Sequence, residues 1–340
     1  MNWQTIWQQI EQKQLAPCYL LAGEESYLIY ETVNRIEAAL GLGQLRDINS
    51  DWLDAAHAHE GRLAAAVAQA PWMADRRLVV VRGIRPKDSS KKVVGKTMVA
   101  QNDLWDQLPA LIESLASTVC LVLCVVGTID KRTKVARAAA KFGELLEFVP
   151  LRGRELEQWI KWRSKELGLG LEPGALSSLL QRAGWSLAQL EQELDKLASY
   201  AQDGGTVSRH DIELLVSESR ESRVFALTDA VLSKNREQAL FALQELLRQG
   251  ERPIGLVGLL AYQLRIVGSA KAALEQKIAP QQVAKMLKIH PYVAQKAVAQ
   301  SRHFSWGEIY RLIRKLAAAD EKLKSTSLEP KLVLEEAILL

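Results

Sequence analysis

The 340-residue chain has few cysteines, no long hydrophobic run and no strong excess of one charge. Three cysteines are too few for a disulfide framework at this length, which favours a reducing compartment. No run reaches eighteen consecutive apolar residues, so no membrane-spanning segment is expected. The segment Met1–Gln4 has neither a basic leader nor an apolar core, so no secretory signal is expected. The cytoplasm is therefore the expected location.

The net charge of +4 is modest, but it is unevenly distributed along the chain. Residues 1–150 carry 17 basic and 17 acidic side chains, and residues 151–212 carry 8 and 9. Residues 213–340 carry 19 basic and 14 acidic side chains. A mildly basic C-terminal third is compatible with a nucleic-acid partner, and equally with solvated helical faces.

The first 150 residues alternate between helix-like and strand-like hydrophobic patterns. The spacing of Trp3, Ile6, Trp7 and Ile10 predicts an opening helix with one buried face. Buried strands are predicted at Cys18–Ala22, Arg77–Arg82, Val119–Val125 and Leu145–Val149. Helices are predicted at 27–40, 63–69, 104–112 and 134–141. Continuous apolar strands separated by helices predict an α/β domain whose parallel sheet is covered on both faces.

After Pro150 only helical patterns remain. Residues 151–212 predict a small helical domain, with a capping box at Ser186 and Gln189 and a helix start at Ser208 and Asp211. A larger helical bundle is predicted for residues 213–340, with helices at 224–232, 237–247, 254–274, 293–302 and 306–323. The expected architecture is α/β plus all-α, in three domains at 1–150, 151–212 and 213–340.

An α/β domain followed by a helical lid suggests a P-loop ATPase, but the phosphate loop is missing where it is expected. The turn after the first strand reads Gly23-Glu-Glu-Ser26. A phosphate loop needs glycines that free its backbone amides, a lysine for the phosphates and a Ser or Thr for Mg²⁺. Two carboxylates beside the turn would instead repel a triphosphate, so we expect no nucleotide site and no bound cofactor.

Other catalytic or metal-binding patterns are weak. Gly95-Lys96-Thr97 resembles the end of a phosphate loop, but Ser90 stands where the first glycine belongs, and a basic surface loop is the expected reading. Cys120 and Cys124 fall on one face of a predicted strand, where cysteines are usually inert core. His57, His59 and His290 lack partnering ligands in the sequence. We expect no metal and no catalytic site in this chain.

Two basic clusters and one apolar tip remain as candidate interaction sites. Residues 76–96 contain eight Arg or Lys side chains, which predict a solvated loop or a phosphate- or subunit-binding segment. Lys131, Arg132 and Lys134 predict either a charged helix start or a contact with DNA or a neighbouring subunit.

The tip is formed by Ala70, Pro71, Trp72 and Met73, between an alanine-rich helix and a strand. Pro71 ends the helix, and it leaves Trp72 and Met73 at the connection. These two side chains either pack into the core or form the anchor of a protein interface, and the residues alone leave both open.

Several segments in order resemble the clamp-loader delta subunits of bacterial DNA polymerase III. The opening PCYLLAGEESYL (17–28) and the segment APWMADRRLVVV (70–81) are similar to the first strand and the clamp-contacting element of that family. The resemblance continues through DKRTK (130–134), LEQELDKL (190–197), VFALTDA (224–230), GERP (250–253), QLR (263–265), HPY (290–292) and DEKLK (320–324). The ordered set covers nearly the whole chain.

The resemblance implies a degenerate AAA+ module that does not bind ATP, a helical lid and a C-terminal collar. It implies a subunit that grips the sliding clamp (the beta subunit) and opens the ring for loading onto primed DNA. The other expected partners are the ATPase subunits and delta-prime in a hetero-pentameric ring, without a membrane. Polymerase activity would belong to the complex. The clamp-contacting pair falls on Trp72 and Met73, where many relatives carry Phe or Leu.

Two other functional classes stay open from the sequence. One is an inactive AAA+-like DNA-binding protein that acts outside the replisome. The other is an active ATPase with an unorthodox phosphate loop. Binding to the sliding clamp separates the first from a clamp-loader subunit, and an ATP-binding assay tests the second.

Overall fold

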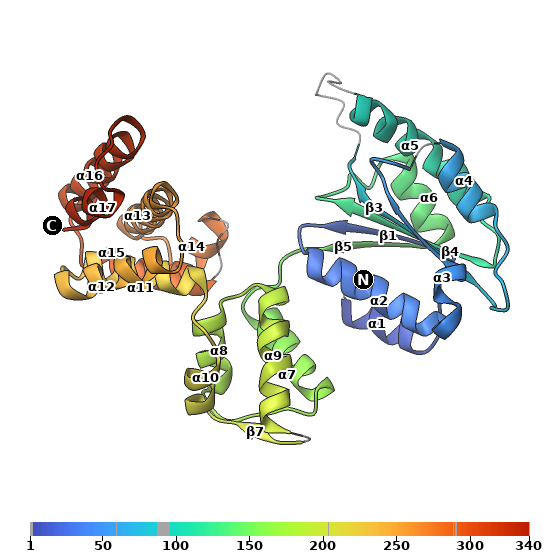
Figure 1. Cartoon of the computed structure of the whole chain (residues 1–340), viewed down its shortest axis with the longest axis horizontal. Helices are drawn as coiled ribbons and strands as arrows, with labels where there is room; N and C mark the ends of the chain where they lie inside the picture. Colours follow the sequence, from blue (N-terminus) through green and yellow to red (C-terminus); the bar gives the residue numbers. More distant parts are fainter. Residues whose placement is uncertain are drawn as a thin grey trace. The chain divides into compact units, whose positions relative to one another are not determined.

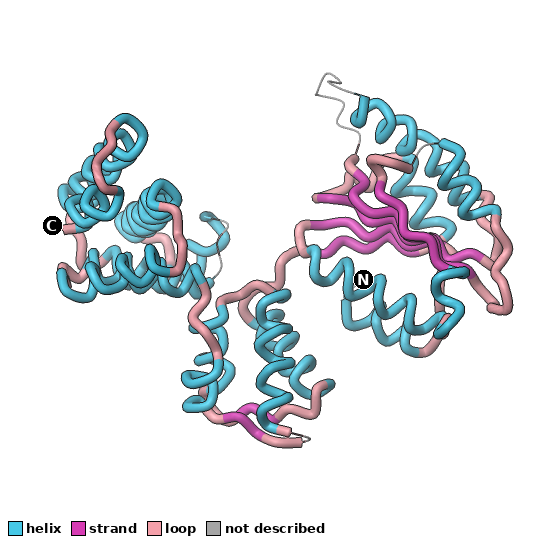
Figure 2. Tube along the Cα trace, viewed as in Figure 1, coloured by secondary structure: helices cyan, strands magenta, loops and turns pink. Residues whose placement is uncertain are grey.

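A computed structural model describes residues 3–58, 60–86, 96–202, 204–287, 289 and 291–339. The chain divides into two compact units, Met1–Leu151 and Arg152–Leu340. Figure 2 shows that the long strands gather in the first unit, while the second unit is almost wholly helical. The predicted class, α/β followed by all-α, is confirmed. A separate boundary near residue 212 stays a prediction.

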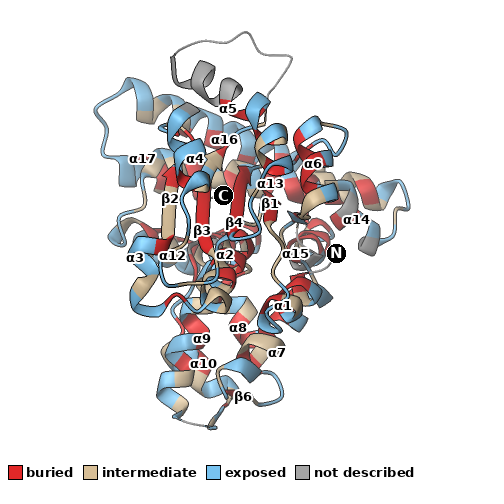
Figure 3. Cartoon of the chain, turned by 90° about the vertical axis from the view of Figure 1, so that its right-hand side faces the viewer, coloured by how far each residue is buried: buried red, intermediate tan, exposed pale blue. Residues whose placement is uncertain are grey.

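The first unit is built on a five-stranded parallel sheet in the order β2-β3-β4-β1-β5. Its strands are β1 Cys18–Gly23, β2 Ser50–Asp54, β3 Arg77–Ile84, β4 Val119–Val126 and β5 Glu144–Phe148. Four of them were predicted, and β1, β3 and β4 each contain a continuous apolar run, as strands covered on both faces do. The sequence analysis missed β2, because the edge strand SDWLD has only two apolar residues. Figure 3 shows β2 mostly half-buried beside the buried β3 and β4.

Helices cover both faces of this sheet (Figure 1). One face carries α1 Trp3–Glu11 and α2 Ser26–Leu40, and the other carries α4 Glu60–Ala68, α5 Lys96–Glu113 and α6 Lys134–Phe142. The predicted buried face of α1 is confirmed, since Trp3, Ile6, Trp7 and Ile10 are all buried. Two short helices, η1 Gly43–Leu45 and α3 Arg46–Asn49, lead into β2.

The second unit begins with four helices and a small parallel pair of strands. These elements are α7 Arg154–Glu166, β6 Gly170–Leu171, α8 Ala175–Ala183, α9 Leu187–Ala201, β7 Thr206–Val207 and α10 Arg209–Leu215. The prediction of only helices after Pro150 is therefore wrong for β6 and β7. Strands of two residues are too short to leave a period-2 pattern in the sequence.

Helix starts in this region were predicted correctly, but one capping box was not. The Ser208 hydroxyl accepts from the Asp211 N–H at 3.3 Å, and the Asp211 carboxylate accepts from the Ser208 N–H at 2.8 Å, which forms a capping box at α10. Ser186 does precede α9, but its side chain makes no capping bond to a described residue.

The rest of the second unit is a helical bundle, as predicted. Its helices are α11 Arg220–Leu232, α12 Arg236–Arg248, α13 Pro253–Glu275, α14 Pro280–Leu287, α15 Pro291–Ser301, α16 Trp306–Ser325 and α17 Pro330–Ile338. The sequence analysis missed the short helices α14 and α17. Both begin with a proline, which reads as a breaker in sequence but suits the first turn of a helix.

The long helix α13 is the centre of this bundle. It packs against α11, α14, α15, α16 and α17, and nine of its residues are buried. Among the described residues, α13 is the one helix whose length and mean hydropathy of 1.3 would suffice to cross a membrane. Half of that apolar stretch is buried inside the protein, as expected for a core helix.

Candidate protein-interaction site

The segment between α4 and β3 exposes two large apolar side chains. Trp72 is 54% exposed and Met73 is 76% exposed, while Ala70 is also exposed and Pro71 is half-buried. The alternative that both large residues pack into the core is therefore wrong. Exposed pairs of this size next to a rigid turn are typical of interface anchors. Residues 70–73 are named the tip below.

The backbone of the tip is tied to α3 by a residue that the sequence analysis missed. The fully buried Asn49 side chain accepts from the Trp72 N–H at 2.7 Å and donates to the Trp72 carbonyl at 2.9 Å. Met73 then adopts a left-handed backbone conformation with φ of 52°. No sequence motif signals a contact between two residues that lie 23 positions apart.

A buried arginine holds α3 itself in place. Arg77 is 5% exposed, and its guanidinium pairs with the Asp51 carboxylate and donates to the Ile48 carbonyl at 2.9 Å. Next to it, Arg76 donates to the Leu15 carbonyl at 2.9 Å. Arg76 and Arg77, the first two basic residues of the cluster at 76–96, therefore have a structural role. The cluster's residues 87–95, which include the Gly95 end of the supposed phosphate loop, lie outside the described residues.

The turn after β1 is a structural joint between strands. The Glu24 and Glu25 N–H groups both donate to the Phe148 carbonyl (3.0 and 3.2 Å), and the Gly23 N–H donates to the Gly127 carbonyl (2.8 Å). A phosphate loop would aim these amides at a phosphate instead. The Glu25 carboxylate caps α2 through the Tyr27 N–H, and burial raises the pKa of Glu25.

Gly23 has no room for a side chain in this turn. A Cβ at Gly23 would lie 1.9 Å from the Phe148 carbonyl oxygen, and the φ of +136° disfavours a side chain as well. We expect Gly23→Ala to lower the free energy of unfolding by about 3 kcal/mol or more, measured by urea denaturation.

Gly83→Ala is the matched control for this change. Gly83 also has a positive φ (+73°), but a Cβ there would meet no described atom within 4 Å. Strain alone should therefore cost about 1 kcal/mol. Equal losses of stability in the two variants would mean that β5 does not crowd Gly23.

The second basic cluster lies at the start of α6, next to the carboxyl end of β4. Lys131 pairs with Glu147 at 3.3 Å, and Arg132 pairs with Asp130 at 2.9 Å. Lys131, Arg132 and Lys134 are all exposed. Exposed pairs of this kind add little stability. A lysine in the first turn of a helix is also unfavourable to the helix dipole, so Lys134 does not stabilise α6 in this way.

The three cysteines are buried and free of disulfides. Burial raises the pKa of Cys18, Cys120 and Cys124 to about 12, so all three stay protonated thiols at neutral pH. His57 is exposed, and His59 and His290 lie outside the described residues. Within the described part of the chain, no three metal-ligating side chains form a group.

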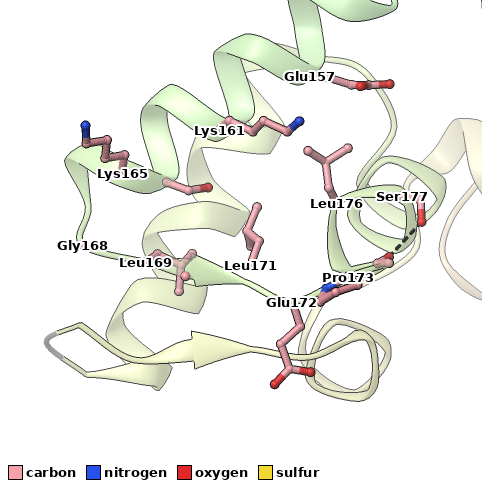
Figure 4. A pocket seen from close by; sticks show the side chains of 13 residues that line it. Glu157, Lys161, Lys165, Gly168, Leu169, Leu171, Glu172, Pro173, Leu176 and Ser177 are labelled. Atoms are coloured by element: carbon pink, nitrogen blue, oxygen red, sulfur yellow. Dashed lines mark hydrogen bonds between the residues drawn. The ribbon is translucent and has the colours of Figure 1, made fainter.

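A shallow hollow of about 800 Å³ lies in the second unit between α7, β6 and the start of α8. Figure 4 shows Leu171 and Leu176 in its middle and Lys165 and Glu172 pointing outward from it. Its lining residues fall within 157–177, so it shares no residue with the tip or with the Gly23 joint.

Comparisons with known proteins point to one family over most of the chain. The family model described as DNA polymerase III, delta subunit matches residues 19–148. The model of the DNA polymerase III delta subunit, C-terminal domain matches residues 221–340. Together the two models match more than half of the chain.

Individual relatives agree with the family models. DNA polymerase III subunit delta of Bacillus subtilis is 29% identical over 97% of this chain and 94% of that protein. The probable DNA polymerase III subunit delta of Aquifex aeolicus is 30% identical over 38% of each chain. Among solved structures, the Bacillus subtilis DNA clamp loader delta protein matches with a TM-score of 0.71. That structural match is 26% identical in sequence and covers 99% of this chain and 98% of the other.

Proposed function

Because this chain belongs to the DNA polymerase III delta subunit family and is a component of a clamp loader, we propose that it grips the sliding clamp through its tip and opens the ring. The observation that carries this proposal is that Trp72 and Met73 are exposed on a turn whose backbone is hydrogen-bonded to Asn49. The sequence's alternative of a DNA-binding protein outside the replisome has no support from these relatives.

The tip has the properties of an anchor that enters an apolar pocket. Two large apolar side chains are exposed to water in the free subunit. Their burial against a partner is favourable, and it breaks no packing within the subunit. Pro71 restricts the backbone of the turn that carries them, and Asn49 forms hydrogen bonds with the Trp72 backbone. Little ordering entropy then remains to be lost on binding.

The test is a pull-down of the purified full-length chain with the cognate sliding clamp, without ATP or other loader subunits. We expect the clamp to be retained. Failure to retain it at micromolar concentrations would reject the proposal.

We further propose that the chain has no ATPase activity of its own. The amides of Glu24 and Glu25 are committed to the Phe148 carbonyl, and their carboxylates would repel a triphosphate. In the complex, ATP would be hydrolysed by other subunits, and DNA synthesis would belong to the holoenzyme.

Isothermal calorimetry should accordingly detect no binding of ATP or Mg²⁺–ATP to the isolated chain at nucleotide concentrations up to about 1 mM. A Kd of about 1 mM corresponds to a binding free energy of only about 4 kcal/mol in magnitude. Micromolar binding that disappears in Glu24→Ala and Glu25→Ala variants would contradict the assignment of this turn as a structural joint.

The remaining partners are proposed from the resemblance and from exposed side chains. Residues 213–340 would form the collar that joins the ATPase subunits and delta-prime in a hetero-pentameric ring. Lys131, Arg132 and Lys134 form an exposed basic surface that suits primed DNA or an acidic neighbouring subunit. A loader works where the chromosome is copied, so we propose the cytoplasm as its location.

A further inference from the structure

Asn49 contacts the tip through both the oxygen and the nitrogen of its carboxamide. It is the last residue of α3, and its side chain is 0% exposed. The carboxamide oxygen accepts from the Trp72 N–H, while the carboxamide nitrogen donates to the carbonyls of Trp72 (2.9 Å) and Leu45 (3.2 Å). An aspartate would lack the donor, and an aliphatic residue would lack both groups.

This pair of bonds fixes the peptide groups on both sides of the Trp72 Cα. Met73, directly after it, has a φ of 52°, which a residue with a Cβ seldom adopts without support. The support is itself anchored, because the buried Arg77 donates to the Ile48 carbonyl next to Asn49. The tip is thus connected through Asn49 and α3 to the first residue of β3.

We propose that Asn49 is a positioning residue for clamp binding: it holds the Trp72–Met73 backbone in the conformation that presents both side chains to the partner. This inference rests on the proposed function. Without Asn49 the tip would sample several conformations, and binding would have to order it again. Ordering one residue's backbone corresponds to a roughly 5- to 30-fold change in a binding constant.

The experiment compares clamp affinity and amide exchange in Asn49→Ala, Trp72→Ala and the double variant, each well below its melting temperature. We expect Asn49→Ala to weaken clamp binding roughly 5- to 30-fold. Hydrogen exchange at the Trp72 amide should also become faster, since its acceptor is lost. In the Trp72→Ala background the same change should cost less than in the wild-type chain, because only the Met73 side chain then remains for Asn49 to position.

Asn235→Ala is the matched control. Asn235 caps α12 by accepting from the Gln238 N–H at 3.1 Å, so its loss destabilises a helix without touching the tip. We expect it to lower the melting temperature and to leave clamp affinity unchanged. If Asn49→Ala does not fold, Asn49→Ser serves instead, because its short hydroxyl cannot reach both Trp72 groups.

The outcomes separate this inference from the proposed function. If Trp72→Ala weakens clamp binding but folded Asn49→Ala binds normally with a faster-exchanging Trp72 amide, Asn49 is not a positioning residue. Equal costs of Asn49→Ala with and without Trp72 would also overturn its role. If Trp72→Ala itself binds the clamp normally, the tip is not the clamp-binding site, and both proposals fall.

Discussion

Trp72→Ala should weaken binding to the sliding clamp about 30-fold or more, while the fold stays intact. Burying a whole Trp side chain removes about 150–250 Å² from water, worth about 4–6 kcal/mol. Because Trp72 is 54% exposed in the free subunit, about 2–3 kcal/mol of this remains to be gained on binding. At about 1.4 kcal/mol per tenfold, the lower figure already corresponds to about 30-fold.

The melting temperature and a second exposed aromatic provide the controls for this variant. Truncation of a half-exposed side chain should shift the melting temperature by less than about 4 °C. Phe241→Ala removes an aromatic that is 66% exposed in the second unit, and it should leave clamp affinity unchanged. A large loss of stability in Trp72→Ala, with clamp binding falling only as folded protein is lost, would contradict the anchor role.

Met73→Ala should act in the same direction, with Met286→Ala as its control. Met73 is 76% exposed at the tip, and Met286 is 48% exposed on α14. The two substitutions remove the same side chain from different units. Only the first should weaken clamp binding, as measured by surface plasmon resonance.

Removal of residues 152–340 should abolish incorporation into the clamp loader and spare clamp binding. The first unit has its own core between the sheet and α5 and α6, so Met1–Leu151 is expected to fold alone. The second unit carries large exposed apolar side chains on the bundle, among them Phe241, Tyr310 and Leu332. Such side chains suit docking to other subunits.

Reconstitution with the other loader subunits and gel filtration measures this prediction. The truncated chain should be absent from the complex, yet bind the clamp within about threefold of the full chain, a difference below 1 kcal/mol. The complementary chain 152–340 should join the complex and fail to bind the clamp. Full incorporation of the truncated chain would mean that the roles assigned to the two units are wrong.

Much of the fold could be predicted because its elements follow simple periodic patterns. β1 and β4 are apolar throughout and β3 has an apolar centre, since both faces of these strands are covered by helices. The edge strand β2 and the two-residue strands β6 and β7 depend on neighbours distant in sequence. A periodic pattern of residues cannot contain that information.

The candidate site could be located from the sequence, but its exposure and support could not. Pro71 marks the end of α4, and the two large residues after it mark a possible anchor. Whether Trp72 packs inward depends on the position of α3, which Arg77 fixes through the Ile48 carbonyl. Asn49 is an ordinary polar residue in sequence, and its role follows only from a bond to a backbone 23 positions away.

Opening of the clamp ring is the most direct test of clamp gripping by the tip. A fluorophore pair placed across one subunit interface of the clamp is quenched while the ring is closed and brightens when it opens. Addition of the full-length chain, without ATP or other subunits, should raise the fluorescence. The Trp72→Ala/Met73→Ala double variant, folded and at the same concentration, should leave it low. A closed ring at saturating wild-type protein, or equal opening by the double variant, would contradict the proposed function of the tip.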